Sequence, residues 1–402
     1  MCPYEEVPRF PFSYRGDRIA PELAGRAEHR PVSRVRANSG DLAWLVTGHR
    51  EVRQVLEDDD RFSLARTADP TAPQQDPVPP PASFSCFDRL MRKAGMREVL
   101  LRGLGAGQQH VTPAQVERAT RDALRTMTRQ GGEGDLVGQV CLPVAATVTC
   151  LLLGLPAEDA PRLEPCFAVL WSGTDPSPLP LEATHLDTYM TQQLARLRRS
   201  PEGLLGDLVA RHDQRRVLSD GELTEICTVL LLSGLGNPAS LLAFSAFSLL
   251  REPRLLDTLG ARPWLVPRAV EELLRVSVML GDGLARIAVE DVEVGGEHIR
   301  AGDLVLVSPD AANADPGVFA DPGRLDLGRD TRRHVRFGRG RHRCPGAAVT
   351  RMLARAYLRV LVEELPGMRL TVSPESVEWR TQTAVTLPVA LPVTWAPSPA
   401  RR

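Results

Sequence analysis

The chain has 402 residues, with 49 Lys and Arg against 50 Asp and Glu and a formal net charge of −1. Such a balance excludes a polyelectrolyte of the histone type, and a hydrophobic content of 43 % excludes a disordered chain. Lys93 is the only lysine, so the other 48 basic residues are arginine. A GC-rich genome would explain this bias, and only the placement of the arginines can show whether it has a further meaning.

Three features predict a cytoplasmic protein that does not span a membrane. The N-terminal residues carry charges and prolines where a secretory signal requires an apolar run. The most apolar stretch, residues 226–250, is interrupted by Gly234, Gly236, Asn237 and Pro238, which favours a buried helix over a membrane span. The seven cysteines are an odd number without a CxxC pair, so reduced thiols are expected rather than a disulfide framework.

The hydrophobic pattern predicts mainly helices. Residues 32–36 and 43–47 flank a turn and are expected to pair as a hairpin, before a short helix at 51–56. Six prolines between residues 70 and 81 exclude regular structure there. Apolar spacing of three and four predicts helices at 113–130, 135–153, 158–171, 182–198, 202–213, 220–251, 253–259 and 264–276. Residues 286–307 and 369–395 are strand-like. We therefore expect one mainly α-helical domain over residues 1–402, with a minor β region.

The segment from Phe337 to Gly346 is the most informative part of the chain. Closely spaced glycines allow the backbone to approach a large group, and Cys344 stands just before a predicted helix. Helix N-termini stabilise the thiolate, which is the form of cysteine that binds metals. His342 and Cys344 could also form half of a zinc site or a nucleophile–base pair. Neither a second ligand pair nor an orienting carboxylate stands nearby, so both alternatives are disfavoured.

The segment resembles the haem-binding signature F-G-x-G-x-H-x-C-x-G of the cytochrome P450 family. The fixed positions of the signature are matched by Phe337, Gly338, Gly340, His342, Cys344 and Gly346. The resemblance implies a haem b cofactor with Cys344 as the iron ligand, and further cofactor contacts at Pro345 and at Gly234. A thiolate ligand suits this chemistry because it favours O–O cleavage.

Other segments extend the resemblance from about residue 7 to about residue 395. Glu272-Leu-Leu-Arg275 resembles the family's ExxR helix and, with Arg324, would form a buried carboxylate–guanidinium network. Arg286 matches the arginine that pairs with a haem propionate, a contact suited to guanidinium. The implied structure is a single-domain cytochrome P450 fold, with the haem between the long central helix and the cysteine loop.

The central helix departs from the family pattern. An acid followed by an alcohol normally relays protons there, but the matching positions fall on Gly236 and Asn237 or on Asn237 and Pro238. Pro238 removes an N–H and crowds the carbonyl of Gly234, so we expect an opened or kinked turn. Either the turn only shapes the pocket, or oxygen chemistry is altered and water held by Asn237 or a substrate hydroxyl supplies the protons. A third hypothesis is that hydrogen peroxide, rather than dioxygen, drives the oxidation.

A second departure lies upstream, where the family usually offers His and Arg four residues apart to the other propionate. Leu100 and Leu104 stand at these places, and Arg97 or Arg102 could substitute.

Arginines cluster around Cys344. Ten lie between Arg329 and Arg359, opposed within that stretch only by Asp330. A nucleic-acid or phosphate patch would have interleaved aromatic residues, but this run holds only Phe337 and Tyr357. The family resemblance instead implies docking of an acidic ferredoxin, supplied by its reductase, because complementary charge speeds encounter.

The resulting prediction is a monooxygenase that oxidises, and most simply hydroxylates, a small organic substrate of secondary metabolism, free or bound to a carrier protein. The pocket is expected to be built from residues 70–86, 171–180, 232–240, 278–284 and 387–389. An enzyme of oxidative coupling, dehydration or peroxide chemistry is the main alternative, and an arginine-rich binding protein is a distant one.

Overall fold

The computed structural model describes residues 7–77, 82–129, 131–163, 185–381 and 386–395. By its internal contacts the chain divides into two compact units. The first unit comprises residues 1–88, 275–325 and 329–344, and the second comprises residues 89–274, 326–328 and 345–402. Each unit is described by itself.

The first unit is built on a five-stranded sheet in the order β1-β2-β8-β5-β3. Its strands are β1 (Val32–Arg36), β2 (Leu42–Val46), β3 (Phe62–Ser63), β5 (Leu284–Ala288) and β8 (Leu304–Val307). The predicted hairpin is confirmed, because β1 and β2 pair antiparallel with Val32 opposite Val46. Strand β2 also pairs in parallel with β8, whose residues come about 260 positions later. The remaining elements are α1 (Pro21–His29), α2 (His49–Glu57), η1 (Ala65–Ala68), α3 (Ala82–Ser85), the β6–β7 hairpin (Val292–Val294 and Glu297–Ile299), α15 (Pro309–Ala312) and η5 (Gly340–His342).

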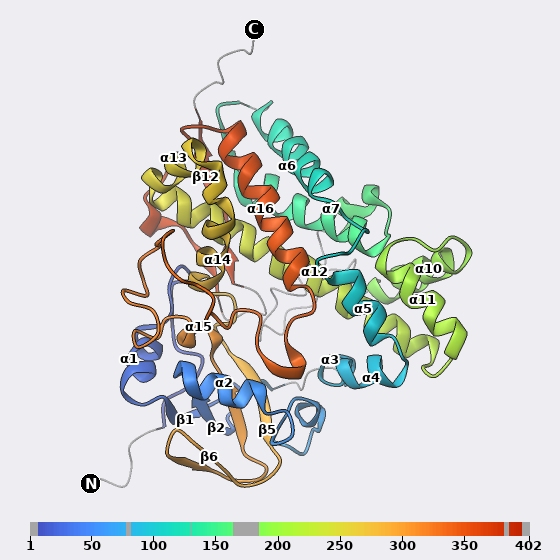
Figure 1. The fold of residues 1–402 in the computed structure, drawn as a ribbon, viewed down its shortest axis with the longest axis vertical. Helices are drawn as coiled ribbons and strands as arrows, with labels where there is room; N and C mark the ends of the chain where they lie inside the picture. The colour runs from blue at the N-terminus through green and yellow to red at the C-terminus, as the bar shows by residue number, and fades with distance from the viewer. Residues whose placement is uncertain (1–6, 78–81, 130, 164–184, 382–385, 396–402) are drawn as a thin grey trace. The chain divides into compact units, whose positions relative to one another are not determined.

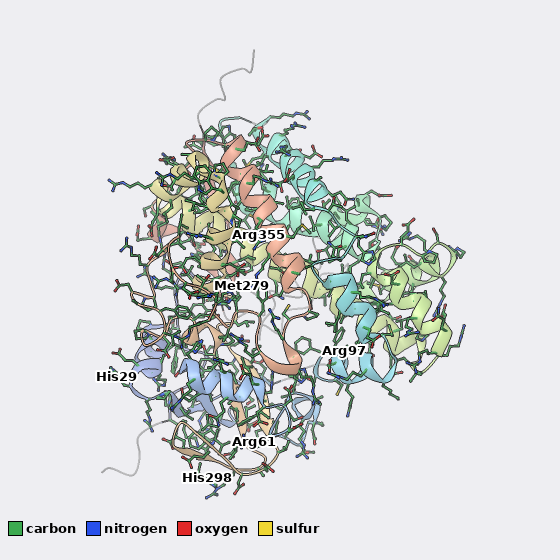
Figure 2. The ribbon with its side chains drawn as sticks, in the orientation of Figure 1. His29, Arg61, Arg97, Met279, His298 and Arg355 are labelled. Atoms are coloured by element: carbon green, nitrogen blue, oxygen red, sulfur yellow. The ribbon has the colours of Figure 1, made fainter. Side chains whose placement is uncertain are left out.

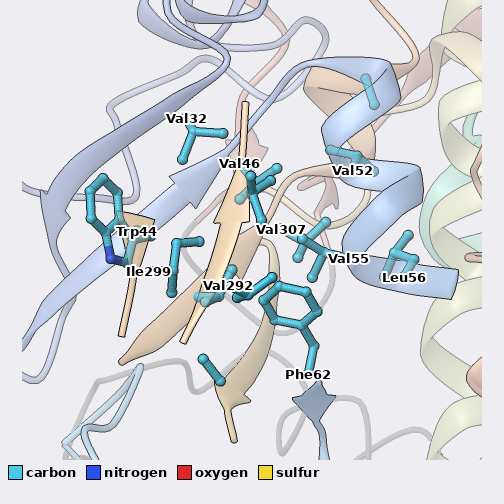
Figure 3. Close-up of a cluster of buried hydrophobic side chains, with 14 of the residues drawn as sticks. Val32, Trp44, Val46, Val52, Val55, Leu56, Phe62, Val292, Ile299 and Val307 are labelled. Carbon is cyan, nitrogen blue, oxygen red and sulfur yellow. The ribbon is translucent and has the colours of Figure 1, made fainter. Parts of the chain in front are cut away.

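Helix α2 packs on this sheet through its apolar face. Figure 3 shows Val52 and Val55 of α2 beside Val46 and Val307 of the sheet, with Phe62 closing the cluster. All five side chains are fully buried. Burial of a valine or phenylalanine contributes about 1.5–3 kcal/mol, so this cluster fixes the position of α2 and of the acidic residues that follow it.

The second unit is helical, as the spacing predicted. Its helices are α5 (Arg97–Leu104), α6 (Pro113–Thr128), η2 (Val137–Cys141), α7 (Leu142–Leu153), η3 (Ala157–Leu163), α10 (Leu186–Arg199), α11 (Gly203–Arg215), α12 (Asp220–Arg251), α13 (Pro253–Ala261), η4 (Pro263–Leu265) and α16 (Ala347–Glu364). Two helices join the units along the chain, α4 (Phe87–Lys93) and α14 (Val266–Val276). In Figure 1, α16 lies alongside α6, and these helices are in contact. The expected helix at 158–171 begins as the 3-10 helix η3, and its remainder falls outside the described residues.

Short strands complete the second unit within the predicted region 369–395. Strand β12 (Pro392–Thr394) pairs with β4 (Glu133–Asp135) and β9 (Arg369–Leu370), and β10 (Trp379–Arg380) pairs with β11 (Leu387–Pro388). A 3-10 turn, η6 (Pro374–Ser376), lies between β9 and β10.

Helix α12 has the predicted bounds and runs without interruption over Pro238. The expected opening of the turn therefore does not break the helix. Its start is fixed by a capping box, in which Ser219 accepts from the N–H of Glu222 and the Glu222 carboxylate accepts from the N–H of Ser219. By length and composition this helix could cross a membrane, but a buried core helix meets the same criterion, and its residues from Ala239 to Leu250 are buried inside the second unit.

Candidate haem site

The loop from Phe337 to Cys344 closes through its own backbone. The N–H of Cys344 donates to the carbonyl of Phe337 over 2.8 Å, and the N–H of Gly338 donates to the carbonyl of Val335 over 2.9 Å. Gly338 and Gly340 both have φ of +65°, a conformation that favours glycine. Cys344 is exposed and is not in a disulfide, and α16 begins three residues later at Ala347. The sequence therefore places one accessible thiol at the end of a glycine loop.

The C-terminal end of α2 supports this loop. A Cβ on Gly340 would overlap the carbonyl oxygen of Leu56, so only glycine fits there. Asp59 follows α2, and its Oδ2 accepts a hydrogen bond from the backbone N–H of Arg341 over 3.0 Å. Its Oδ1 lies 3.6 Å from Nε2 of His342. Asp59 was not predicted as a site residue; its place in the acidic run 57–60 is the only signal in the sequence.

Arg286 on β5 provides the test of whether a haem carboxylate fits. The residue is 4 % exposed, and its Nε has no hydrogen-bond partner among the described residues. One other nitrogen donates to the carbonyl of Ala285 over 2.8 Å. Burial lowers the pKa of Arg286 to about 10, and the charge of Asp59 opposes that shift. A buried guanidinium with an orphaned N–H calls for an anion, which is what a propionate would supply.

His342 lies in the same electrostatic environment. Burial lowers its pKa first, and the positive charge of Arg286 lowers it further. The carboxylates of Asp59 and Asp88 act in the opposite direction, while Arg341 adds to the lowering. Within the first unit, the charges of Arg286 and Asp59 therefore act in opposite directions on His342, which lies in the same loop as Cys344.

The ExxR residues are buried, as the resemblance implied. Glu272 accepts the N–H of Asp326 over 3.1 Å. Arg275 donates to the carbonyl of Asn313 over 2.9 Å and to that of Arg324 over 3.4 Å. The prediction that the guanidinium of Arg324 joins the network is wrong. Its side chain is exposed, and the residue contributes its backbone carbonyl instead.

A third buried arginine, Arg336, was missed because the sequence analysis counted it only as part of the basic run. Arg336 is 6 % exposed and donates to Oδ1 of Asp310 over 2.5 Å and to the carbonyl of Ser277. Oδ2 of Asp310 accepts the N–H of Leu280 over 3.1 Å. The pair ties α15 to the segment that follows α14, just before β5 and Arg286.

The basic segment 329–359 is largely neutralised by acids from elsewhere in the chain. Its ion pairs are Arg332–Asp330, Arg336–Asp310, Arg341–Asp59, Arg351–Glu271, Arg355–Glu271 and Arg359–Glu117. Figure 2 labels Arg355 on α16, whose guanidinium lies 3.5 Å from the carboxylate of Glu271. Asp330 is the only acid within this segment, but in the folded chain acids from other segments pair with several of its arginines. The expectation of a basic run opposed by a single acid is therefore wrong. Arg333, Arg339 and Arg343 are the three arginines of this segment that form no ion pair with a described residue and donate no side-chain hydrogen bond to one.

In the second unit, α12 carries the remaining predicted site residues. Asn237 is exposed, and so is Ser233 four positions earlier, so both lie on one face of the helix. Gly234 has a packing role that the sequence did not reveal, since a Cβ there would lie 2.7 Å from Cγ2 of Thr149. Leu100 and Leu104 of α5 are buried.

The comparisons with known proteins decide the family. The cytochrome P450 family model matches residues 264–384. The chain is 38 % identical to nocardicin C N-oxygenase from Nocardia uniformis subsp. tsuyamanensis over 396 residues, covering 96 % of this chain and 98 % of that protein. The chain belongs to the cytochrome P450 family. It is 33 % identical to mycocyclosin synthase from Mycobacterium tuberculosis, with coverage of 96 % and 98 %.

Solved structures agree with this cytochrome P450 assignment. The crystal structure of the LnmA cytochrome P450 hydroxylase, from the leinamycin biosynthetic pathway of Streptomyces atroolivaceus, superposes with a TM-score of 0.83 at 34 % identity. That match covers 97 % of this chain and 100 % of the other. The protein is accordingly a cytochrome P450 monooxygenase with haem b as its cofactor, and its mostly helical single-domain fold is that of the family. The distant alternative, an arginine-rich binding protein without enzymatic activity, is excluded.

Proposed function

We propose that Cys344, at the end of the loop 337–344, binds the haem iron. The accessible thiol at the end of a loop closed by its own backbone carries this proposal. When bound, a haem with a thiolate ligand activates dioxygen, since electron donation from sulfur favours O–O cleavage. Phe337, Gly338, Pro345 and Gly346 would form the remaining contacts on the cysteine side.

Arg286 and His342 would hold a propionate. The orphaned Nε of Arg286 donates to the carboxylate, and His342 donates a second hydrogen bond. Asp59 accepts from the backbone of Arg341 and keeps the turn 340–342 in place for this contact. For the second propionate, Arg97 and Arg102 of α5 stay candidates.

On the oxygen side, Asn237 and Ser233 would replace the missing acid–alcohol pair. Neither side chain has a hydrogen-bond partner among the described residues, and both are exposed on one face of α12. An amide cannot release a proton at neutral pH, so its role is to hold a water molecule that does. Oδ1 of Asn237 would accept from this water, while its Nδ2 and the Ser233 hydroxyl fix the orientation.

Electrons would come from a ferredoxin and its reductase in the cytoplasm. Arg333, Arg339 and Arg343 are the arginines of the cysteine segment left for an acidic partner, because the others already have acidic or carbonyl acceptors. Complementary charge would raise the encounter rate. The docking surface would therefore be smaller than the count of ten arginines implied.

The substrate would be a small organic molecule of secondary metabolism, free or attached to a carrier protein. Relatives named for N-oxygenation, hydroxylation and hydroxylation/epoxidation support an oxygen insertion. Two relatives are named synthases, and a solved relative is titled a putative thioether synthase. These names keep oxidative bond formation as the second candidate function, and the missing acid–alcohol pair favours it.

One spectroscopic experiment tests the cofactor assignment, and one kinetic comparison tests the reaction. The reduced, CO-treated protein should absorb at the long wavelength typical of a thiolate-bound haem, and Cys344→Ala should abolish that band. Persistence of the band in the variant would overturn Cys344 as the ligand. Turnover with ferredoxin and reductase should exceed turnover with hydrogen peroxide; the reverse result would favour a peroxygenase.

A further inference from the structure

The hydroxyl of Thr149 on α7 reaches the backbone of α12. Its Oγ1 lies 2.6 Å from the carbonyl oxygen of Gly234, and the side chain is 3 % exposed. The two residues are 85 positions apart, and both belong to the second unit. Figure 1 shows α7 passing close to α12, and the two helices are in contact.

Gly234 is the residue whose carbonyl lacks its usual donor. In an α-helix that carbonyl accepts from the N–H four residues later, which here belongs to Pro238 and does not exist. A backbone carbonyl without a donor costs free energy inside a protein, so a replacement is needed. The Thr149 hydroxyl occupies the position of that replacement.

The absence of a side chain at residue 234 makes the contact possible. A Cβ there would lie 2.7 Å from Cγ2 and 3.2 Å from Oγ1 of Thr149, so the helices could not approach as closely. The three residues therefore depend on one another. Pro238 removes a hydrogen-bond donor, the missing side chain of Gly234 lets α7 approach, and Thr149 on α7 supplies the replacement donor.

Thr149 has two acceptors within reach but one hydroxyl hydrogen. Its Oγ1 also lies 2.7 Å from the carbonyl of Ala145, on its own helix. That carbonyl faces the N–H of Thr149 itself at the regular spacing of α7, whereas the carbonyl of Gly234 has lost its regular donor. The hydrogen therefore serves Gly234.

We infer that Thr149 is a positioning residue: its hydroxyl substitutes for the N–H that Pro238 lacks and holds the turn of α12 that carries Asn237. This replacement of the missing N–H by a hydroxyl explains why α12 remains continuous over Pro238. The positioning of Asn237 rests on the proposed function, whereas the replacement of the Pro238 N–H by the Thr149 hydroxyl does not.

A double-mutant cycle, read out by amide hydrogen exchange in the full-length chain, tests whether the Thr149 hydroxyl replaces the missing N–H of Pro238. Thr149→Val keeps the shape of the side chain and removes the donor, so amide exchange in peptides covering residues 230–241 should accelerate about tenfold. Thr149→Ser should restore slow exchange. Thr147→Val is the matched control on the same helix, because Thr147 has no hydrogen-bond partner among the described side chains and should leave exchange unchanged.

The second half of the cycle measures the effect of Thr149→Val in a chain that already carries Pro238→Ala. The alanine returns an N–H to position 238, so Thr149→Val should then accelerate exchange less than about threefold. Equal acceleration in both backgrounds, or none in the native background, would overturn the inference. A chain that failed to bind haem would still give this readout, so failure of the proposed function is recognised separately.

An infrared measurement tests the positioning of Asn237. The C–O stretching band of the reduced, CO-bound protein responds to polar groups near the bound gas. Thr149→Val should shift the band toward that of Asn237→Leu, while Thr149→Ser and Thr147→Val should not move it. An unmoved band in Thr149→Val would limit Thr149 to packing and contradict the positioning role.

Discussion

The carboxylate of Asp59 accepts a hydrogen bond from the backbone N–H of Arg341 over 3.0 Å, joining residues 282 positions apart. The same carboxylate lies 3.6 Å from His342 and opposes the lowering of the pKa of Arg286. The half-buried carboxylate of Asp59 thus holds the turn before Cys344 and acts on the charge of the group that would bind a propionate.

Asp59→Asn should weaken haem retention. The substitution leaves a neutral acceptor for the N–H of Arg341 and removes the charge beside Arg286. Charge-assisted hydrogen bonds contribute about 1.5–3 kcal/mol, so transfer of haem to an excess of apomyoglobin should become about tenfold faster. Asp60→Asn is the matched control, because that neighbour is 93 % exposed and lies 3.9 Å from Arg341. Equal rates of haem loss from the two variants would show that Asp59 has no specific role in haem retention.

Asp282 should make stability depend on pH. Burial raises its pKa to about 7, with help from the charges of Asp76 and Asp310. The unfolded carboxyl has an ordinary pKa of about 4, so between about pH 4 and pH 7 the folded state binds the extra proton. Stability contributed by this group is present below pH 4 and is lost as pH rises toward 7.

Asp282→Asn should remove this loss. Its Tm should exceed that of the native protein by about 2–4 °C at pH 8 and by little at pH 4.5. The measurement is a thermal unfolding series in buffers of equal ionic strength. The opposite order, with the larger gain at acidic pH, would show that Asp282 is charged in the folded state and stabilised by an unseen partner.

Charge reversal should separate docking arginines from structural ones. Arg333→Glu, Arg339→Glu and Arg343→Glu together should lower the rate of reduction by a ferredoxin at least tenfold at low salt, with the difference shrinking as salt is added. The charge-matched control reverses Arg118, Arg254 and Arg268, which are exposed on α6, α13 and α14. If both triple variants lose rate equally, net charge rather than a local surface steers the partner.

The sequence was sufficient to predict the elements whose bounds are set by residues close together in the chain. The bounds of α12 follow from the Ser219–Glu222 capping box and from the Glu252–Pro253 stop, both of which are local signals. The hairpin β1–β2 follows from its alternation and turn.

Long-range pairing could not be predicted in the same way. The acids that neutralise the basic segment lie 26 positions away for Arg336, 80 for Arg351 and 242 for Arg359. No periodicity relates such residues, because their contact depends on how elements pack. The same holds for Thr149 and for Asp59. The error over Arg324 has another origin: a family motif marks a position but does not say whether its side chain or its carbonyl is used.

Asn237→Thr should show whether the unusual turn of α12 is impaired or specialised. Threonine would restore the hydroxyl that the family pattern places near this point, and a hydroxyl can both donate to and accept from a water molecule. If the native turn is an impaired proton relay, coupling of electron consumption to product should rise severalfold, and less hydrogen peroxide should be released.

A specialised turn predicts the opposite for Asn237→Thr. The product should then change in identity, because protons would arrive where the native reaction withholds them. Product analysis by mass spectrometry alongside peroxide quantification distinguishes the two outcomes. Ser233→Ala serves as the companion variant, since it removes a hydroxyl from the same helix face without touching Pro238. Unchanged coupling and unchanged product in both variants would exclude this face of α12 from proton delivery.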